Sequence, residues 1–165
     1  MKSLTTPRLT IRALEQDDLT AFHAICGDEN AMRLMGDGLP LTLEQTQQWI
    51  TVSQNNYKLH SRGCMAVIER DSNALIGFCG LVAGDTAGEI ELIYALAPSH
   101  WGRGYATESA GAMLEYGLTI LPRIHASIYP QNKASRRILE KLGFEETRVE
   151  SDGTVFFRLQ SAVSA

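Results

Sequence analysis

Two kinds of hydrophobic pattern divide this chain into short segments. Short apolar or alternating runs predict β-strands, because alternation with a period of two gives a strand one buried face. Such runs occur at residues 8–12, 64–69, 75–82, 89–96, 124–129 and 155–159. Apolar residues at helical spacing predict helices at residues 17–26, 43–61, 103–117 and 133–142.

The signals at the segment ends agree with this division. Thr42 followed by Gln45 forms a capping box, which predicts that a helix begins after Thr42. Residues 70–73 read as a hairpin turn, Pro98 ends a strand, and Gly143 occupies the C-terminal cap position of a helix. The order of these elements predicts one α+β domain with a mixed sheet.

Length and composition limit the possible classes of protein. A chain of 165 residues fits one domain, residues 1–165, and the hydrophobic fraction of 44% is typical of a soluble globular protein. No apolar run approaches the roughly 20 residues that span a bilayer, and the first residues lack the apolar stretch of a secretory signal. We therefore expect a cytoplasmic protein without a membrane partner.

Charge and cysteine content exclude two further classes. The formal net charge is −4 and the chain has no basic run, so it lacks the electrostatic features of a nucleic-acid binder. Its three cysteines are odd in number and widely spaced, which predicts neither a disulfide framework nor a zinc site. An anionic ligand must therefore be held by local geometry, because the overall charge repels it.

The clearest chemical signal is the sequence Trp-Gly-Arg-Gly-Tyr-Ala-Thr at residues 101–107, between a strand and a helix. Gly102 and Gly104 remove side-chain bulk where the backbone must approach a ligand. Successive N–H groups at the start of a helix favour an anion, and Arg103 adds a positive charge. A pyrophosphate suits this turn. The alternative is that the glycines only make a tight connection between the strand and the helix.

Two other phosphate-binding motifs do not fit the chain. A P-loop requires Gly-x-x-x-x-Gly-Lys followed by Ser or Thr, and no such run occurs. A dinucleotide-binding fold has its glycine-rich turn after the first strand, whereas this turn lies past the middle of the chain. A nucleotide-binding module is therefore the weakest of the alternatives.

Three segments together resemble the GNAT acetyltransferases, in particular the branch of ribosomal-protein N-terminal acetyltransferases (RimJ/RimL-like) and their small-molecule relatives. Residues 6–12 are similar to the first strand of that branch. Residues 93–108 are similar to its acyl-CoA signature, and residues 132–144 are similar to the motif that follows. Because the three segments occur in the family's order, the resemblance covers a core of residues 7–159.

The resemblance implies a GNAT-type α+β fold, with a mixed central sheet that splays open between two strands and helices on both faces. It also implies acetyl-CoA as the acetyl donor, with no metal. The pantetheine arm is expected in the opening, on the backbone of Tyr94, Ala95 and Leu96 and beside Asn132. The pyrophosphate is expected on the amides of the turn, namely those of Gly102, Arg103, Gly104, Tyr105, Ala106 and Thr107.

The same resemblance assigns the group that protonates the departing thiolate. Many members of the superfamily have a tyrosine for this purpose at the position of Leu139, and leucine cannot donate a proton. The ribosomal-type enzymes have a serine at the position of Ser135, which therefore inherits the role and a contact with the cofactor. Asn132 and Ser135 share a helix face, although capping of that helix is the alternative use of both side chains.

An amine acceptor must also lose a proton, which a carboxylate can accept. Glu89 and Glu91 flank Ile90 in an otherwise apolar strand, and a period of two places both on one face unless a bulge intervenes. We expect Glu91, which is nearer the cofactor, to act as the base or to hold the amine, with Glu89 as the second candidate. An exposed polar strand end is the alternative, and His100 and His125 are weaker candidates.

The predicted function is transfer of an acetyl group from acetyl-CoA to a primary amine, either a protein N-terminal α-amine or a small-molecule amine, by direct attack on the thioester. The alternative is a non-catalytic acyl-CoA-binding regulatory domain. Met35, Trp49 and Tyr57 lie where the family forms its acceptor cleft, but packing among helices is their expected use. The sequence does not identify the acceptor or decide between a carboxylate and water as the base, and a homodimer is a family-based possibility.

Overall fold

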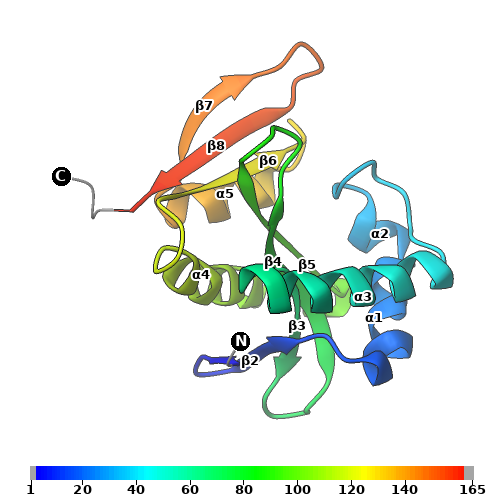
Figure 1. Ribbon diagram of the computed structural model, residues 1–165. Coiled ribbons are helices and arrows are strands. Elements are labelled where there is room, and N and C mark those ends of the chain that lie inside the picture. Colours follow the sequence, from blue (N-terminus) through cyan, green and yellow to red (C-terminus); the bar gives the residue numbers. More distant parts are fainter. Residues whose placement is uncertain (1–2, 162–165) are drawn as a thin grey trace.

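The computed structural model describes residues 3–161, which form one mixed β-sheet flanked by helices (Figure 1). The strands of the described residues are hydrogen-bonded in the order β1-β2-β3-β4-β5-β6-β8-β7. They are β1 (Leu4–Thr5), β2 (Leu9–Ala13), β3 (Cys64–Glu69), β4 (Leu75–Ala83), β5 (Ile90–Leu96), β6 (Arg123–Ile128), β7 (Glu145–Val149) and β8 (Val155–Gln160). This architecture confirms the predicted α+β fold with a mixed sheet.

Helices cover both faces of the sheet. They are α1 (Leu19–Cys26), α2 (Glu29–Met32), α3 (Leu43–His60), α4 (Tyr105–Gly117) and α5 (Lys133–Lys141), with short 3-10 turns η1 (Gln16–Asp18) and η2 (Pro98–His100). On one face, Phe22 of α1 and Ile50 of α3 pack against Phe78 of β4. On the other face, Met113 of α4 and Leu139 of α5 belong to a second apolar cluster.

The central strands are apolar throughout because helices cover both of their faces. In β3, Cys64, Ala66 and Ile68 pack in the cluster of α1 and α3, while Met65 and Val67 pack in the cluster of α4. Alternate side chains of a strand point to opposite faces, so both sets are buried. The continuous apolar run at these residues follows from this two-sided burial.

The sheet changes direction between β5 and β6. These strands are parallel neighbours, and their register contains one pair within the described residues, Glu91 with His125. β6 instead pairs along its length with β8, from Arg123 opposite Gln160 to Ile128 opposite Val155. Figure 1 shows β6 and β8 running at an angle to β4 and β5. The sheet therefore opens past Glu91, at the place that the family resemblance implies.

Two strands and one α-helix of the described residues were not predicted from the hydrophobic pattern. β7 is exposed along its whole length, so it carries no apolar face that alternation would reveal. α2 has four residues and β1 has two, which is too short for a periodic signal. The capping box of Thr42 with Gln45 is confirmed, and Gly143, predicted at the C-terminal cap of α5, follows the C-cap residue Leu142 with a φ of 87°.

Candidate functional site

The turn at residues 101–107 has the geometry of an anion site. α4 begins at Tyr105 with Gly104 as its N-cap, so the unpaired N–H groups of its first turn lie here. Gly102 and Gly104 have φ values of 73° and 80°, a region that residues with a Cβ rarely adopt. A Cβ built on Gly102 would meet no atom within 4 Å, so this side of the turn is open to a ligand.

Arg8, which precedes β2, holds the turn in place. Its Nη1 donates to the carbonyl oxygen of Arg103 at 2.8 Å, and its Nε donates to Glu108 Oε2 at 2.7 Å. The guanidinium also lies 4.4 Å from the centre of the Tyr105 ring. Thr6 donates from Oγ1 to Glu108 Oε1, so the first turn of α4 is tied to the chain before β2. These contacts fix the direction in which the turn presents its amides.

Substitution of Arg8 by lysine tests this anchoring. Lysine keeps the charge but cannot contact Arg103 and Glu108 at the same time, because it lacks the guanidinium fork. We expect the Kd for acetyl-CoA to rise about fivefold, which corresponds to the loss of one hydrogen bond of about 1 kcal/mol. Titration calorimetry measures the Kd, with Arg62→Lys, between α3 and β3, as the control. Equal Kd values for the two variants would show that the turn does not depend on Arg8.

Ser135 and Tyr94 form a hydrogen-bonded pair between α5 and β5. The Tyr94 hydroxyl donates to Ser135 Oγ at 3.1 Å. Burial raises the pKa of Tyr94 to about 12, so its hydroxyl stays protonated and remains a donor. A serine oxygen that accepts one hydrogen bond still has its own proton to donate elsewhere. Asn132 Oδ1 accepts from the Ser135 N–H at 3.1 Å, which caps α5 and fixes the position of the serine.

Glu91 in β5 and Glu89, which directly precedes this strand, point to the face of β5 opposite to that of Tyr94. Ser127 of β6 donates from Oγ to Glu91 Oε2 at 3.2 Å, and His125 Nδ1 lies 3.7 Å from Glu89 Oε1. Because His125 and Ser127 alternate in β6, both carboxylates face the same side of the sheet, as the spacing predicts. Glu91 Oε1 and Glu89 Oε2 are buried and have no hydrogen-bond partner among the described residues. Each carboxylate thus keeps one acceptor that no described group satisfies.

Burial sets the protonation behaviour of this cluster. It raises the pKa of the Glu91 carboxyl above its ordinary value, in spite of the hydrogen bond from Ser127. Burial also lowers the pKa of His125, in spite of the charge of Glu89 nearby. Near neutral pH the histidine is therefore mainly uncharged, and Glu91 is a stronger base than an exposed glutamate.

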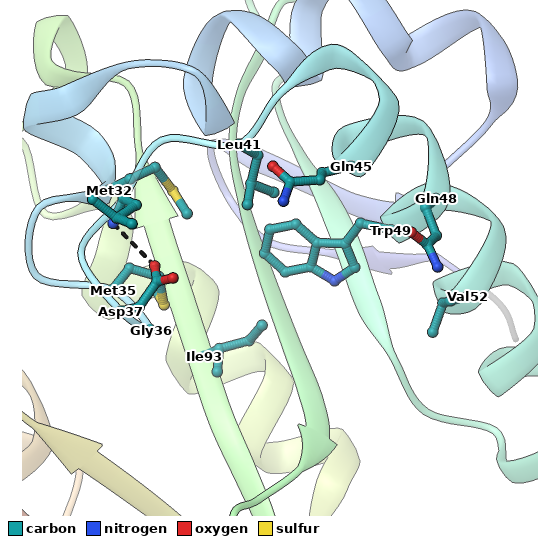
Figure 2. A pocket seen from close by; sticks show the side chains of 11 residues that line it. Met32, Met35, Gly36, Asp37, Leu41, Gln45, Gln48, Trp49, Val52 and Ile93 are labelled. Carbon is teal, nitrogen blue, oxygen red and sulfur yellow. Dashed lines mark hydrogen bonds between the residues drawn. The ribbon is translucent and has the colours of Figure 1, made fainter.

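A pocket of about 450 Å³ opens on the same side of the sheet as the carboxylates. Figure 2 shows the Trp49 ring on one side and the loop between α2 and α3 on the other, with Ile93 of β5 between them. The apolar side chains that line it include Met32, Met35, Leu39, Trp49, Val52 and Ile93. Asp37 is the charged residue of the lining within the described residues, and its Oδ1 accepts from the Leu39 N–H at 3.0 Å.

The structure arranges the predicted residues in two groups on opposite faces of β5. Tyr94 packs with the α4 cluster, whereas Ile93 and Ala95 pack with the α1 cluster. Sequence reasoning assigned only the backbone of Tyr94 and missed both its hydroxyl and Ser127. The polar alternation of His125 and Ser127 in an otherwise apolar strand was the available signal for the latter.

The three residues considered for the acceptor cleft, Met35, Trp49 and Tyr57, also lie in two different places. Trp49 and Met35 line the pocket, and they also pack against the apolar cluster around α1. Tyr57 is buried and donates from its hydroxyl to the carbonyl oxygen of Gly63, so it belongs to the core. The expectation of core packing thus holds fully for Tyr57 and in part for the other two.

Metal sites, membrane-spanning helices and reactive cysteines were also sought in the part of the chain that the structure describes. It contains no group of three or more His, Cys, Asp or Glu residues able to hold a metal ion. None of its helices is long and apolar enough to cross a membrane. Cys26, Cys64 and Cys79 are free and buried, and burial raises the pKa of Cys26 to about 12, which makes its thiol unreactive.

Known proteins share this sequence pattern and this fold. A family model described as an acetyltransferase (GNAT) domain matches residues 8–145. The uncharacterized N-acetyltransferase YoaA of Bacillus subtilis (strain 168) is 32% identical over 152 residues, which cover 88% of this chain and 84% of YoaA. An acetyltransferase from Agrobacterium tumefaciens str. C58 has a similar structure, with a TM-score of 0.83 and 25% identity over 97% of this chain and 95% of that one.

The fold also matches RimL, described as a ribosomal L7/L12 alpha-N-protein acetyltransferase in complex with coenzyme A. The TM-score is 0.84, and the match covers 99% of this chain and 100% of RimL. At 13% identity this likeness concerns the fold alone. It agrees with the splayed sheet that the sequence resemblance implies.

Proposed function

Since the chain belongs to the GNAT acetyltransferase family, we propose that it transfers the acetyl group of acetyl-CoA to a primary amine, which attacks the thioester directly. The acceptor is a protein N-terminal α-amine or a small-molecule amine. The observation that carries this proposal is the opening between β5 and β6. It has Ser135 and Tyr94 on one face and Glu91 on the other.

The donor is expected in this opening because the chain's own groups fit it. The amides from Gly102 to Thr107 bind the pyrophosphate, and the open space beside Gly102 leaves room for the phosphates. The edge of β5 that faces β6, at Tyr94, Ala95 and Leu96, binds the pantetheine arm, with Asn132 beside it; the carbonyl oxygen of Leu96 already accepts from Trp101 Nε1. Acetyl-CoA supplies the activated acetyl group.

Glu91 prepares the acceptor. Its carboxylate accepts an N–H of the incoming ammonium and takes the proton, directly or through a water molecule. Its raised pKa brings it closer to the pH at which it works, which improves it as a base. Glu89, with its own buried oxygen, helps to hold the amine.

Ser135 receives the leaving group. As the tetrahedral intermediate collapses, negative charge develops on sulfur, and the free Ser135 hydroxyl proton is donated to it. Tyr94 positions the serine by donating to Oγ, so the Ser135 proton points away from the tyrosine. These groups would be unnecessary in a regulator that only binds acyl-CoA, which supports the enzyme over that alternative.

A thermal melt tests whether the donor binds as proposed. Acetyl-CoA at a hundredfold excess over its Kd should stabilise the folded protein by about 2.7 kcal/mol. Gly102→Val should abolish this gain, because a side chain would occupy the open space in the turn. Gly88→Val is the matched control, because Gly88 also has a positive φ and empty space around it but lies in the turn before β5. A melt of the unaltered protein that acetyl-CoA does not shift would contradict the proposal.

A further inference from the structure

The pocket described above opens on the face of the sheet that carries Glu91, although neither carboxylate is among its lining residues, and its position bears on the kind of amine that fits. Ile93 lines the pocket and follows Glu91 by two residues in β5, so the two side chains point to the same face about 7 Å apart. Tyr129, two residues after Ser127, donates from its hydroxyl to the carbonyl oxygen of Gly36 in the pocket-lining loop. The loop wall is therefore tied to the end of β6, beside the site of proton transfer.

The carboxylates and the pocket suit different parts of an amine acceptor. Glu89 and Glu91 each keep a carboxylate oxygen without a partner among the described residues, and an ammonium group is a donor with the charge opposite to theirs. Beyond them, the wall of Met35, Trp49 and Ile93 offers an apolar surface. A volume of about 450 Å³ lies within the usual range for a small-molecule site.

A second positive charge on the acceptor would be unfavourable in this pocket. The polar side chains of its lining, within the described residues, are those of Asp37, Gln45 and Gln48; the remaining side chains are apolar and offer an ammonium no acceptor. Asp37 is exposed, and one of its carboxylate oxygens already accepts from the Leu39 N–H. The pocket thus favours an uncharged carbon skeleton over a polyamine.

Resting on the proposed function, we propose that the acceptor is a small primary monoamine with an apolar skeleton. Glu89 and Glu91 bind its ammonium group, and the pocket between Trp49 and the loop of Met35 binds its alkyl or aryl group. In the reaction Glu91 takes one proton of the ammonium, the amine nitrogen forms a bond to the acetyl carbon, and the carbon–sulfur bond breaks. Ser135 donates its proton to the thiolate and recovers one, through water, as the nitrogen loses its second proton to give the amide.

A comparison of kcat/KM for matched acceptors tests this assignment. Hexylamine and hexamethylenediamine have the same chain length and differ only in the second ammonium group, and phenethylamine adds an aromatic skeleton. We expect kcat/KM for hexylamine and phenethylamine to exceed that for hexamethylenediamine and for spermidine by at least about tenfold. Equal or faster turnover of the diamine, of spermidine or of a peptide with N-terminal serine would overturn the inference.

A charge placed at the pocket tests where the skeleton binds. Leu39 lines the pocket and Leu59 lies elsewhere, on α3; their side chains are 62% and 74% exposed, so both positions tolerate glutamate without loss of the fold. Leu39→Glu should raise KM for hexylamine about tenfold and leave KM for hexamethylenediamine unchanged or lower. Leu59→Glu should change neither. Equal KM values for Leu39→Glu and Leu59→Glu would overturn the location.

Failure of this inference differs from failure of the proposed function. If amines are acetylated but the diamine is preferred, the function stands and only the acceptor class is wrong. If acetyl-CoA shifts the melt but none of these amines or the peptide is acetylated, the proposed function fails, and the inference fails with it.

Discussion

Glu91→Gln is expected to lower kcat about a hundredfold, within the usual range for the loss of a general base. Glutamine keeps the size of the side chain and an oxygen that accepts from Ser127, but it cannot take a proton from the amine. Steady-state kinetics with hexylamine at saturating acetyl-CoA measure the effect. Glu89→Gln is the control and should cause a smaller loss. Equal and small losses from both variants would mean that neither carboxylate accepts the proton.

The pH dependence and stability of this variant follow from the raised pKa of Glu91. The base must be ionised, so kcat/KM of the unaltered enzyme should fall as the pH decreases through a value above that of an ordinary glutamate. The folding stability depends on pH in the opposite direction. The folded state favours the protonated form, so stability due to this group is present at low pH and is lost as the pH rises through the raised pKa. At pH 8, Glu91→Gln should therefore melt at the same temperature as the unaltered protein or higher, in contrast to its loss of activity.

Ser135→Ala is expected to lower kcat by about a hundredfold, the typical effect of removing one donor that stabilises developing charge. The sulfur of a thioester is a poor acceptor, so this hydrogen bond matters mainly in the transition state, and the Kd for acetyl-CoA should stay nearly unchanged. Kinetics and calorimetry of the same variant separate the two quantities. Full kcat in Ser135→Ala would assign the serine to helix packing alone.

Two further variants distinguish the partners of Ser135. Tyr94→Phe keeps the ring in the core but no longer orients the serine, so kcat should fall by about tenfold, less than in Ser135→Ala, with an unchanged Kd. Asn132→Ala should instead weaken acetyl-CoA binding and destabilise the fold by about 1 kcal/mol, because Asn132 caps α5. Leu139→Tyr is a poor rescue for the lost hydroxyl, because Leu139 is 1% exposed and a larger side chain would overpack the core.

The sequence predicted those parts of the fold that carry a periodic apolar signal or a turn residue with a specific conformation. The apolar runs of β3 and β4 and the glycines of the turn before α4 are examples, and their elements occur at the expected residues. β7 could not be predicted in this way, because its exposed side chains give no pattern. The opening between β5 and β6 came from the family resemblance, since local periodicity does not encode which strands become neighbours.

The same limit applies to the site. The spacing of Glu89 and Glu91 predicted a shared face, because that depends only on strand geometry. The bond between Tyr94 and Ser135 joins residues 41 positions apart, and no local signal in either segment indicates it. The pocket is built from α2, the following loop, α3 and β5, so it exists only after these segments pack together.

The most direct test of the central claim is the acetylation of an amine coupled to consumption of acetyl-CoA. The enzyme is incubated with acetyl-CoA and hexylamine, and the released CoA thiol and the N-acetylated amine are quantified in the same sample by mass spectrometry. The account predicts one acetylated amine for each thiol released, and rates of both that fall together in Glu91→Gln and Ser135→Ala. Release of thiol without acetylated amine, or equal product formation by the unaltered enzyme and both variants, would contradict it.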